Sequence, residues 1–248
     1  MKKYLTLGAL LFLISCTPTA KDEADKQDQE PKLTIDSDSI KRRFGECKAD
    51  SSIYCTQVNF TYPVFDGSSV ALSLNEVFEK EALQVYLKDS INSNLASHAD
   101  DFVADYKSIK ERFDKAFGWQ SSLNSQVVRS DSNLLVIETI VEVYTGGAHG
   151  IYEVYYLNLA ADSGKALRLK DVFTPGYDSY LNKLIKSKIG DANDVSLEGT
   201  YYNSNFGLLE DGVKFYYNAY EIAPYASGPT EILISYQDLD GILKNEYK

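Results

Sequence analysis

Residues 134–159 read LLVIETIVEVYTGGAHGIYEVYYLNL, and this stretch decides the fold. Strands are expected around residues 134–144 and 151–159. The turn between them, TGGAHG, holds three glycines within residues 145–150, which permit the positive φ angles and close backbone approach of a hairpin. Because a strand rather than a helix follows, the turn is not a phosphate-binding loop. The stretch therefore predicts an antiparallel hairpin.

Working outward from this hairpin, helices and strands come in blocks. Residues 54–65 alternate and are rich in aromatic residues, so they predict a strand that Pro63 places at an edge or an end. Ser73 and Glu76 form a capping box that opens a helix to about residue 95. Further strands are expected near residues 123–129, 206–209, 213–219 and 231–236, a third helix over 177–189, and a short helix at the end. A second helix carries Phe102, Tyr106, Ile109, Phe113 and Phe117 on one face and ends at Gly118.

This block order predicts the fold class and the division of the chain. We expect an α+β fold with mostly antiparallel sheets, helices packed on one face, and two adjoining subdomains. Residues 1–15 are expected to be a lipoprotein signal peptide and residues 16–40 a disordered acidic tether. Residues 41–130 would then form the N-terminal subdomain, and residues 131–248 the C-terminal subdomain with the histidine turn.

The N-terminus has the features of a lipoprotein signal. Lys2 and Lys3 precede an apolar run over residues 5–14, which covers only about half of a ~30 Å hydrocarbon core. The run ends in Leu-Ile-Ser-Cys, a lipobox that predicts cleavage before Cys16 and a lipid on its thiol. The alternative is an ordinary secretory signal with a chance cysteine. We expect a membrane-anchored lipoprotein of the outer membrane, with the periplasmic or surface face left open.

The remaining cysteines, Cys47 and Cys55, are expected to form a disulfide, since an exported protein lies in an oxidising compartment. The alternative is a two-cysteine metal site, which needs further ligands. His98 and His149 are the only histidines, and they are remote in sequence. We therefore predict no metal and no cofactor.

Charge limits the partners. Cleavage before Cys16 would remove Lys2 and Lys3, leaving 23 basic against 36 acidic residues and a net charge of −13. Such a surface repels nucleic acid and anionic lipid, and it attracts cationic proteins. Keeping an exported protein soluble is an equally simple role for this charge.

Two segments hold the candidate binding residues. The first is the turn at 144–150, with Tyr144 and His149. The second, residues 216–228, reads YYNAYEIAPYASG and contains Tyr220, Glu221 and Tyr225. Tyrosines offer rigid amphipathic contact area, although a tyrosine-rich sheet core explains most of the 19 tyrosines. No nucleophile stands in a recognisable frame with His149, and a lone carboxylate is no glycosidase signature. We therefore expect no catalytic residues and no enzyme.

Taken together, five stretches resemble the RsiV/PdaC-type extracytoplasmic domain family over about residues 41–248. They are NFTYP at 59–63, YTGGAHG at 144–150, GK at 164–165, LKDVF at 169–173 and YEIAPYASG at 220–228. The resemblance implies two adjoining domains of unknown function, the second with the histidine turn. It also implies recognition, since one member is a membrane anti-sigma factor whose outer domain binds lysozyme, and another carries this region ahead of a peptidoglycan deacetylase domain.

The sequence departs from both members. It lacks the transmembrane helix of the first, and its two histidines cannot supply the Asp-His-His metal site of the second. Three hypotheses follow. The first is a non-catalytic binding module for a basic muramidase such as lysozyme, or for a cell-wall glycan. The second is a structural or assembly lipoprotein that contacts another envelope protein. The third is an envelope-polymer hydrolase with His149 as base and Glu221 as its partner.

Overall fold

The computed structural model describes residues 32–45, 47, 52–189 and 201–248. The expected signal peptide, the lipidation site Cys16 and the tether as far as residue 31 lie outside the described residues and stay predictions. Among the described residues, no helix is long and apolar enough to cross a membrane.

A five-stranded sheet organises the first part of the chain, in the order β1-β2-β3-β4-β5. β2 and β3 are parallel, and the other neighbours are antiparallel. A parallel pair needs a long crossover, and here it consists of α1 (Ala71–Glu81), a π-helical turn (Ala82–Tyr86) and α2 (Leu95–Arg112). The strands are β1 (Thr34–Gly45), β2 (Cys55–Asp66), β3 (Gln120–Ser130), β4 (Leu134–Tyr144) and β5 (Ile151–Ala160).

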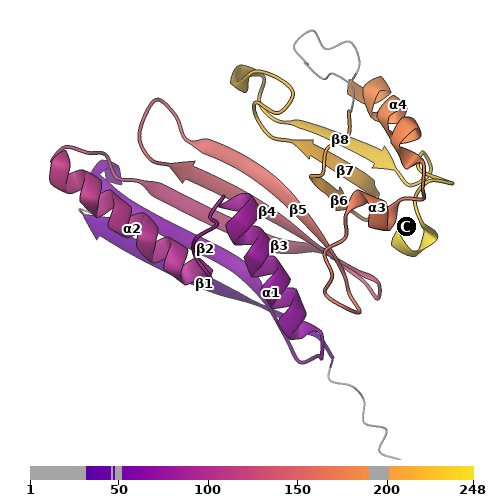
Figure 1. The fold of residues 1–248 in the computed structure, drawn as a ribbon, viewed down its shortest axis with the longest axis horizontal. Helices are drawn as coiled ribbons and strands as arrows, with labels where there is room; N and C mark the ends of the chain where they lie inside the picture. Colours follow the sequence, from indigo (N-terminus) through magenta and orange to yellow (C-terminus); the bar gives the residue numbers. More distant parts are fainter. Residues whose placement is uncertain (1–31, 46, 48–51, 190–200) are drawn as a thin grey trace, which may run out of the picture. The chain divides into compact units, whose positions relative to one another are not determined.

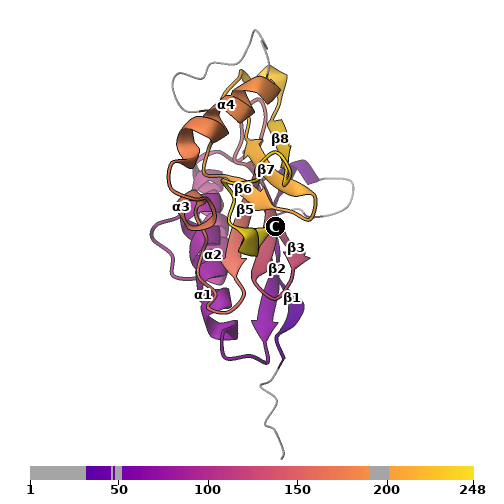
Figure 2. The ribbon, with the colours of Figure 1, turned by 90° about the vertical axis from the view of Figure 1, so that its right-hand side faces the viewer.

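Helices α1 and α2 cover one face of this sheet, as Figure 2 shows. Leu74 and Phe78 of α1 pack in one core with Phe60 of β2. The expected capping box is wrong, because α1 begins at Ala71 and Ser73 donates its hydroxyl to the carbonyl oxygen of Ser163. A side-chain cap occurs instead at α2, where Asn94 accepts from the backbone of Ser97.

A second, three-stranded antiparallel sheet follows β5 in the chain (Figure 1). It packs on the β4–β5 hairpin on the side away from α1 and α2, so the start of β4 is buried on both faces. Leu135 and Ile137 join the core beneath the helices, whereas Leu134 and Val136 join the core of the second sheet. The strands of the second sheet are β6 (Phe206–Leu208), β7 (Gly212–Tyr217) and β8 (Thr230–Ser235). The helices α3 (Leu169–Val172) and α4 (Tyr177–Ile189) precede them in the chain.

Three asparagine side chains join the two sheets along the outer edge of β5, and we call Asn158, Asn205 and Asn218 the asparagine network. Asn218 accepts from the backbone N–H of Val154, and Asn205 accepts from that of Tyr156. Asn158, which is 2% exposed, donates to the carbonyl of Phe206 and accepts from the N–H of Leu208. The network satisfies backbone groups that a sixth strand would otherwise pair with.

The expected fold class is confirmed, but several boundaries differ. The first helix, expected to run to about residue 95, ends with the π-helical turn at Tyr86. Strand β1 begins at Thr34, inside the segment expected to be tether, because its backbone pairs with β2 although most of its side chains are exposed. Helix α2 ends at Arg112, so Phe113 and Phe117 are 63% and 55% exposed rather than part of its buried face. The boundary expected between residues 130 and 131 falls between the hydrogen-bonded strands β3 and β4.

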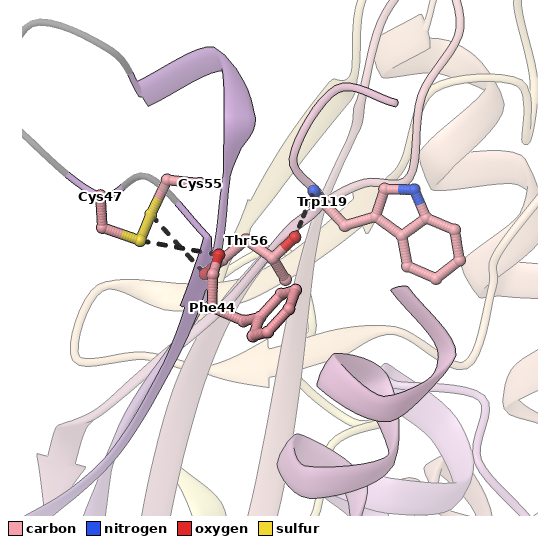
Figure 3. Close-up of a disulfide and its surroundings, with 5 residues drawn as sticks. All are labelled: Phe44, Cys47, Cys55, Thr56 and Trp119. Carbon is pink, nitrogen blue, oxygen red and sulfur yellow. Dashed lines mark hydrogen bonds between the residues drawn. A yellow bond between two sulfur atoms is a disulfide. The ribbon is translucent and has the colours of Figure 1, made fainter. Parts of the chain in front are cut away.

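The disulfide between Cys47 and Cys55 is confirmed, with Cα atoms 4.7 Å apart. It lies where β1 and β2 meet, and Figure 3 shows it beside Phe44 and Thr56. The Thr56 hydroxyl accepts from the backbone N–H of Trp119, at 3.0 Å, so the covalent link lies directly beside the contact between β2 and the segment that leads into β3.

Candidate functional site

The turn between β4 and β5 is exposed and held by its own side chains. Gly146 and Gly147 have φ angles of 103° and 98°, in the left-handed region that favours glycine. The Tyr144 hydroxyl donates to the carbonyl of Gly147 at 3.1 Å. His149 Nδ1 lies 2.9 Å from the carbonyl oxygen of Gly150. Because a carbonyl only accepts, Nδ1 carries the proton, and Nε2 of the neutral ring can accept a hydrogen bond from a partner.

The second candidate segment begins where β7 ends, at Tyr217, two residues before the expected end of the strand. Tyr220 has a φ of 73°, an uncommon value for a residue with a side chain, and such positions cluster at functional sites. A short 3-10 helix over Tyr225–Ser227 then turns the chain toward β8. This conformation holds Tyr220 and Tyr225 at the surface, 67% and 39% exposed.

The structure brings the two segments together through aromatic stacking. The rings of His149 and Tyr225 are 4.2 Å apart between centroids and 19° from parallel. The ring of Tyr220 also contacts Tyr225, and the centroids of these two rings are 5.3 Å apart. We call His149, Tyr220 and Tyr225 the aromatic platform. It joins three of the five expected binding residues on one exposed surface, with Tyr144 bracing the turn below.

Glu221 does not join the platform. Its carboxylate accepts from Asn203 Nδ2 at 3.3 Å and lines a cavity of about 390 Å³. The residue is exposed, but its concave surroundings desolvate the carboxylate and raise its pKa. Hydrogen bonds from Asn203 and Asn218 favour the charged form and lower the pKa, but desolvation has the larger effect. Among the described residues, no hydrogen bond links Glu221 to His149, so the pairing required by the hydrolase hypothesis is absent there.

The cavity was not predicted from the sequence. It lies where the π-helical turn, β5, residues 201–205 and β7 meet. Tyrosines make up much of its wall, namely Tyr86, Tyr155, Tyr156, Tyr201, Tyr202 and Tyr217. The abundance of tyrosine was a general signal, but nothing local marked Asn203. The described residues contain no group of three or more histidine, cysteine or acidic side chains that could hold a metal ion.

Replacing Glu221 by glutamine should raise the melting temperature at pH 7. Because the folded-state pKa is raised, the folded protein binds a proton more readily than the unfolded chain, and stability falls as pH rises through the raised value. Glutamine removes this loss, so the gain over the parent protein should shrink as pH falls through the raised value and be absent below about 4, the ordinary range of glutamate. Thermal unfolding from pH 3 to pH 8 measures this, with exposed Glu111→Gln as control; a gain independent of pH would contradict it.

Comparisons with known proteins match two stretches of the chain to described families. Residues 50–152 match a family described as "Deacetylase PdaC", from near the start of β2 to the start of β5. Residues 170–237 match a family described as "Protein of unknown function (DUF3298)", from α3 to just beyond β8. The chain therefore contains a PdaC-type domain followed by a DUF3298 domain, and the resemblance to the RsiV/PdaC-type family is confirmed.

Two solved structures share the fold. A DUF3298-family member from Bacteroides fragilis superposes with a TM-score of 0.69 at 24% identity, covering 88% of this chain and 96% of its own. A DUF3298-family protein from Pseudomonas aeruginosa superposes with a TM-score of 0.65 at 22% identity, covering 88% and 97%. No curated protein matches the chain. The name of the first family describes its namesake deacetylase and assigns no activity to this chain.

Proposed function

We propose that this chain is a cell-envelope lipoprotein whose globular part is a non-catalytic binding module for a basic partner protein, a muramidase such as c-type lysozyme. The observation that carries the proposal is the aromatic platform. Two loops separate in sequence present His149, Tyr220 and Tyr225 as one stacked, solvent-exposed surface. Lipid on Cys16 would hold the module at the membrane.

The platform has the properties of a recognition surface. Exposed aromatic rings with polar tips supply contact area together with hydrogen bonds, and such residues often dominate binding energy. The ring contacts of Tyr225 with His149 and Tyr220 restrain the three side chains before a partner arrives, so less conformational entropy is lost on binding. A rigid sheet beneath the turn positions them, because β4 and β5 are paired along their whole length.

Charge supports a basic partner. The expected mature chain carries a net charge of −13, from 23 basic and 36 acidic residues. A carboxylate also lies near the turn, since Glu142 of β4 pairs with Tyr152 of β5 just below it. Complementary charge accelerates association and makes its rate depend on salt.

Calorimetric titration tests the proposal, using the chain from Thr17 onward so that β1 stays whole. With c-type lysozyme we expect sub-micromolar binding at low salt, roughly 8 kcal/mol or more, and weaker binding as salt rises. His149→Ala and Tyr225→Ala should each weaken binding at least about tenfold, since truncating an anchoring aromatic costs about 2 kcal/mol or more. Tyr180→Ala, at another exposed tyrosine on α4, should leave affinity unchanged.

Other results of the titration would change the proposal in different ways. Binding with no salt dependence would remove charge steering, and no heat at either salt would contradict capture of lysozyme. Heat with soluble cell-wall fragments instead would favour the glycan alternative. If neither binds, the assembly alternative gains, and the exposed side chains of Ile53, Phe113 and Phe117 mark where an envelope partner would be sought.

A further inference from the structure

The cavity beside Glu221 is lined by two carboxylates, and only one of them has a cation beside it. Glu81 forms an ion pair with Arg168, which lines the same cavity, and the side chain of Glu81 is only 12% exposed. Glu221 takes part in none of the ion pairs among the described residues. The arginine on one wall is therefore already used, and the carboxylate on the other wall keeps its charge.

The surroundings of Glu221 make this charge costly. Desolvation by the concave wall raises the pKa of its carboxyl group, and the negative charge of Glu153 raises it further. Glu153 itself has a cation, because Lys88 Nζ lies 2.8 Å from its carboxylate. The one side chain that donates to the Glu221 carboxylate within hydrogen-bond distance is that of Asn203, at 3.3 Å. A partly desolvated carboxylate gains more from an added cation than one in open water does.

Glu221 and two tyrosine rings are within reach of an occupant. Glu221 is exposed, and Tyr155 and Tyr202 are partly exposed on the cavity wall. The hydroxyls of both tyrosines already donate to carboxylates, so these residues present their rings to the cavity. The face of a tyrosine ring attracts a cation. Tyr201 is not counted with them, because Lys186 Nζ already lies 5.3 Å from the centroid of its ring.

This combination of groups favours a guanidinium over other cations. A guanidinium is planar, stacks on aromatic rings, and presents paired donors that match a carboxylate. It is also more weakly hydrated than an ammonium, so bringing it into the cavity costs less. A metal ion lacks ligands, because the described part of the chain holds no group of three or more histidine, cysteine or acidic side chains that could bind one. The volume of about 390 Å³ lies within the range of small-ligand pockets, roughly 300–1,000 Å³.

The cavity and the aromatic platform share one segment of the chain. Tyr220 belongs to the platform, and the next two residues, Glu221 and Ile222, line the cavity. Consecutive Cα atoms are only about 3.8 Å apart, so a protein held on the platform brings its neighbouring side chains close to Glu221. Arginine is among the residues that most often dominate the binding energy of an interface.

We propose that this cavity binds the side chain of an arginine, which a partner protein inserts when the platform captures it. The guanidinium pairs with the Glu221 carboxylate and stacks on a tyrosine ring, and the aliphatic part of the side chain lies against Val85, which lines the cavity and is 43% exposed. The identity of the partner rests on the proposed function, whereas the affinity of the cavity for a guanidinium does not.

Titration of the chain from Thr17 onward with N-acetyl-arginine amide, followed by NMR, tests the cavity by itself. We expect a dissociation constant below about 10 mM, as for a single weakly anchored group. N-acetyl-citrulline amide has nearly the same shape but no charge, so it should bind at least about tenfold more weakly. N-acetyl-lysine amide should also bind more weakly than the arginine amide, because its ammonium is strongly hydrated.

Replacing Glu221 by glutamine separates binding from folding. Glutamine keeps the shape of the side chain and removes its charge, so the arginine amide should bind at least about tenfold more weakly. The same variant is expected to melt at a higher temperature at pH 7, so unfolding would not explain a loss of binding. Glu111→Gln, at an exposed carboxylate of α2 outside the cavity, should leave the affinity for the arginine amide unchanged.

A titration with c-type lysozyme then identifies the source of the arginine. If lysozyme supplies it, Glu221→Gln should weaken lysozyme binding about tenfold, although His149 and Tyr225 are intact. Unchanged lysozyme affinity would overturn insertion by this partner and leave a guanidinium site. The cavity proposal itself is overturned if the arginine amide does not bind at about 10 mM, if the citrulline amide binds equally well, or if Glu221→Gln binds the arginine amide as tightly as the parent protein. Because lysozyme is absent from the amide titrations, they can fail while the proposed function stands.

Discussion

Replacing Asn158 by alanine should lower the free energy of unfolding by about 3–4 kcal/mol. Its amide donates to the Phe206 carbonyl at 2.7 Å and accepts from the Leu208 N–H at 2.8 Å. The truncation leaves two buried backbone groups of β6 without partners, at about 1–3 kcal/mol each. It also removes a direct link between the two sheets. Thermal unfolding should show a melting temperature lower by roughly 10 °C.

Asn124→Ala is the matched control, because Asn124 lies on an exposed position of β3 and makes no side-chain hydrogen bond among those described. Its effect should stay within about 0.5 kcal/mol. If Asn158→Ala unfolds with the same midpoint and the same denaturant dependence as Asn124→Ala, the asparagine network does not couple the sheets in solution.

Replacing Arg129 by methionine should cost about 2–4 kcal/mol. Its side chain is 11% exposed and pairs with Asp131 at 2.8 Å. One guanidinium nitrogen also donates to the Tyr236 hydroxyl at 2.7 Å and reaches the carbonyls of Leu208 and Tyr247, both at 3.4 Å. Methionine keeps much of the apolar stem but leaves these acceptors without their shared donor. Denaturant unfolding, with stability extrapolated to water, measures the loss.

Arg42→Met provides the comparison. Arg42 also pairs with an aspartate, Asp100, at 2.5 Å, but the two side chains are 37% and 60% exposed. An exposed pair contributes about 0–1 kcal/mol. Equal losses for the two variants would show that burial and the carbonyl contacts of Arg129 add nothing to its ion pair.

Local signals were sufficient for the hairpin and the fold class. The glycines of the turn and the strands on either side specify an antiparallel pair without reference to the rest of the chain. The disulfide likewise followed from the number of cysteines. Strand β1 carried no such signal, because its polar side chains are mostly exposed and only backbone pairing with β2 makes it a strand.

At the candidate site, too, single residues could be predicted from the sequence, but their arrangement could not. His149, Tyr220 and Tyr225 were identified one by one from residue type and loop position, but their stacking depends on how the second sheet packs against the β4–β5 hairpin. Glu221 was placed with them because it is adjacent in sequence, whereas the left-handed turn at Tyr220 directs it to the cavity. The role of Asn203 could not be predicted, since an asparagine after two tyrosines has no pattern that distinguishes it from a loop residue.

The asparagine network also bears on how this protein avoids aggregation. An open strand edge invites another chain to pair with it. At β5 the amides of Asn205 and Asn218 occupy backbone groups of Val154 and Tyr156 that an incoming strand would use. At the opposite edge, β1 presents exposed, solvated charged side chains such as those of Asp36, Asp38, Lys41 and Arg43, and charged residues of this kind blunt an edge strand. Copies at high local concentration could then meet without pairing their sheets.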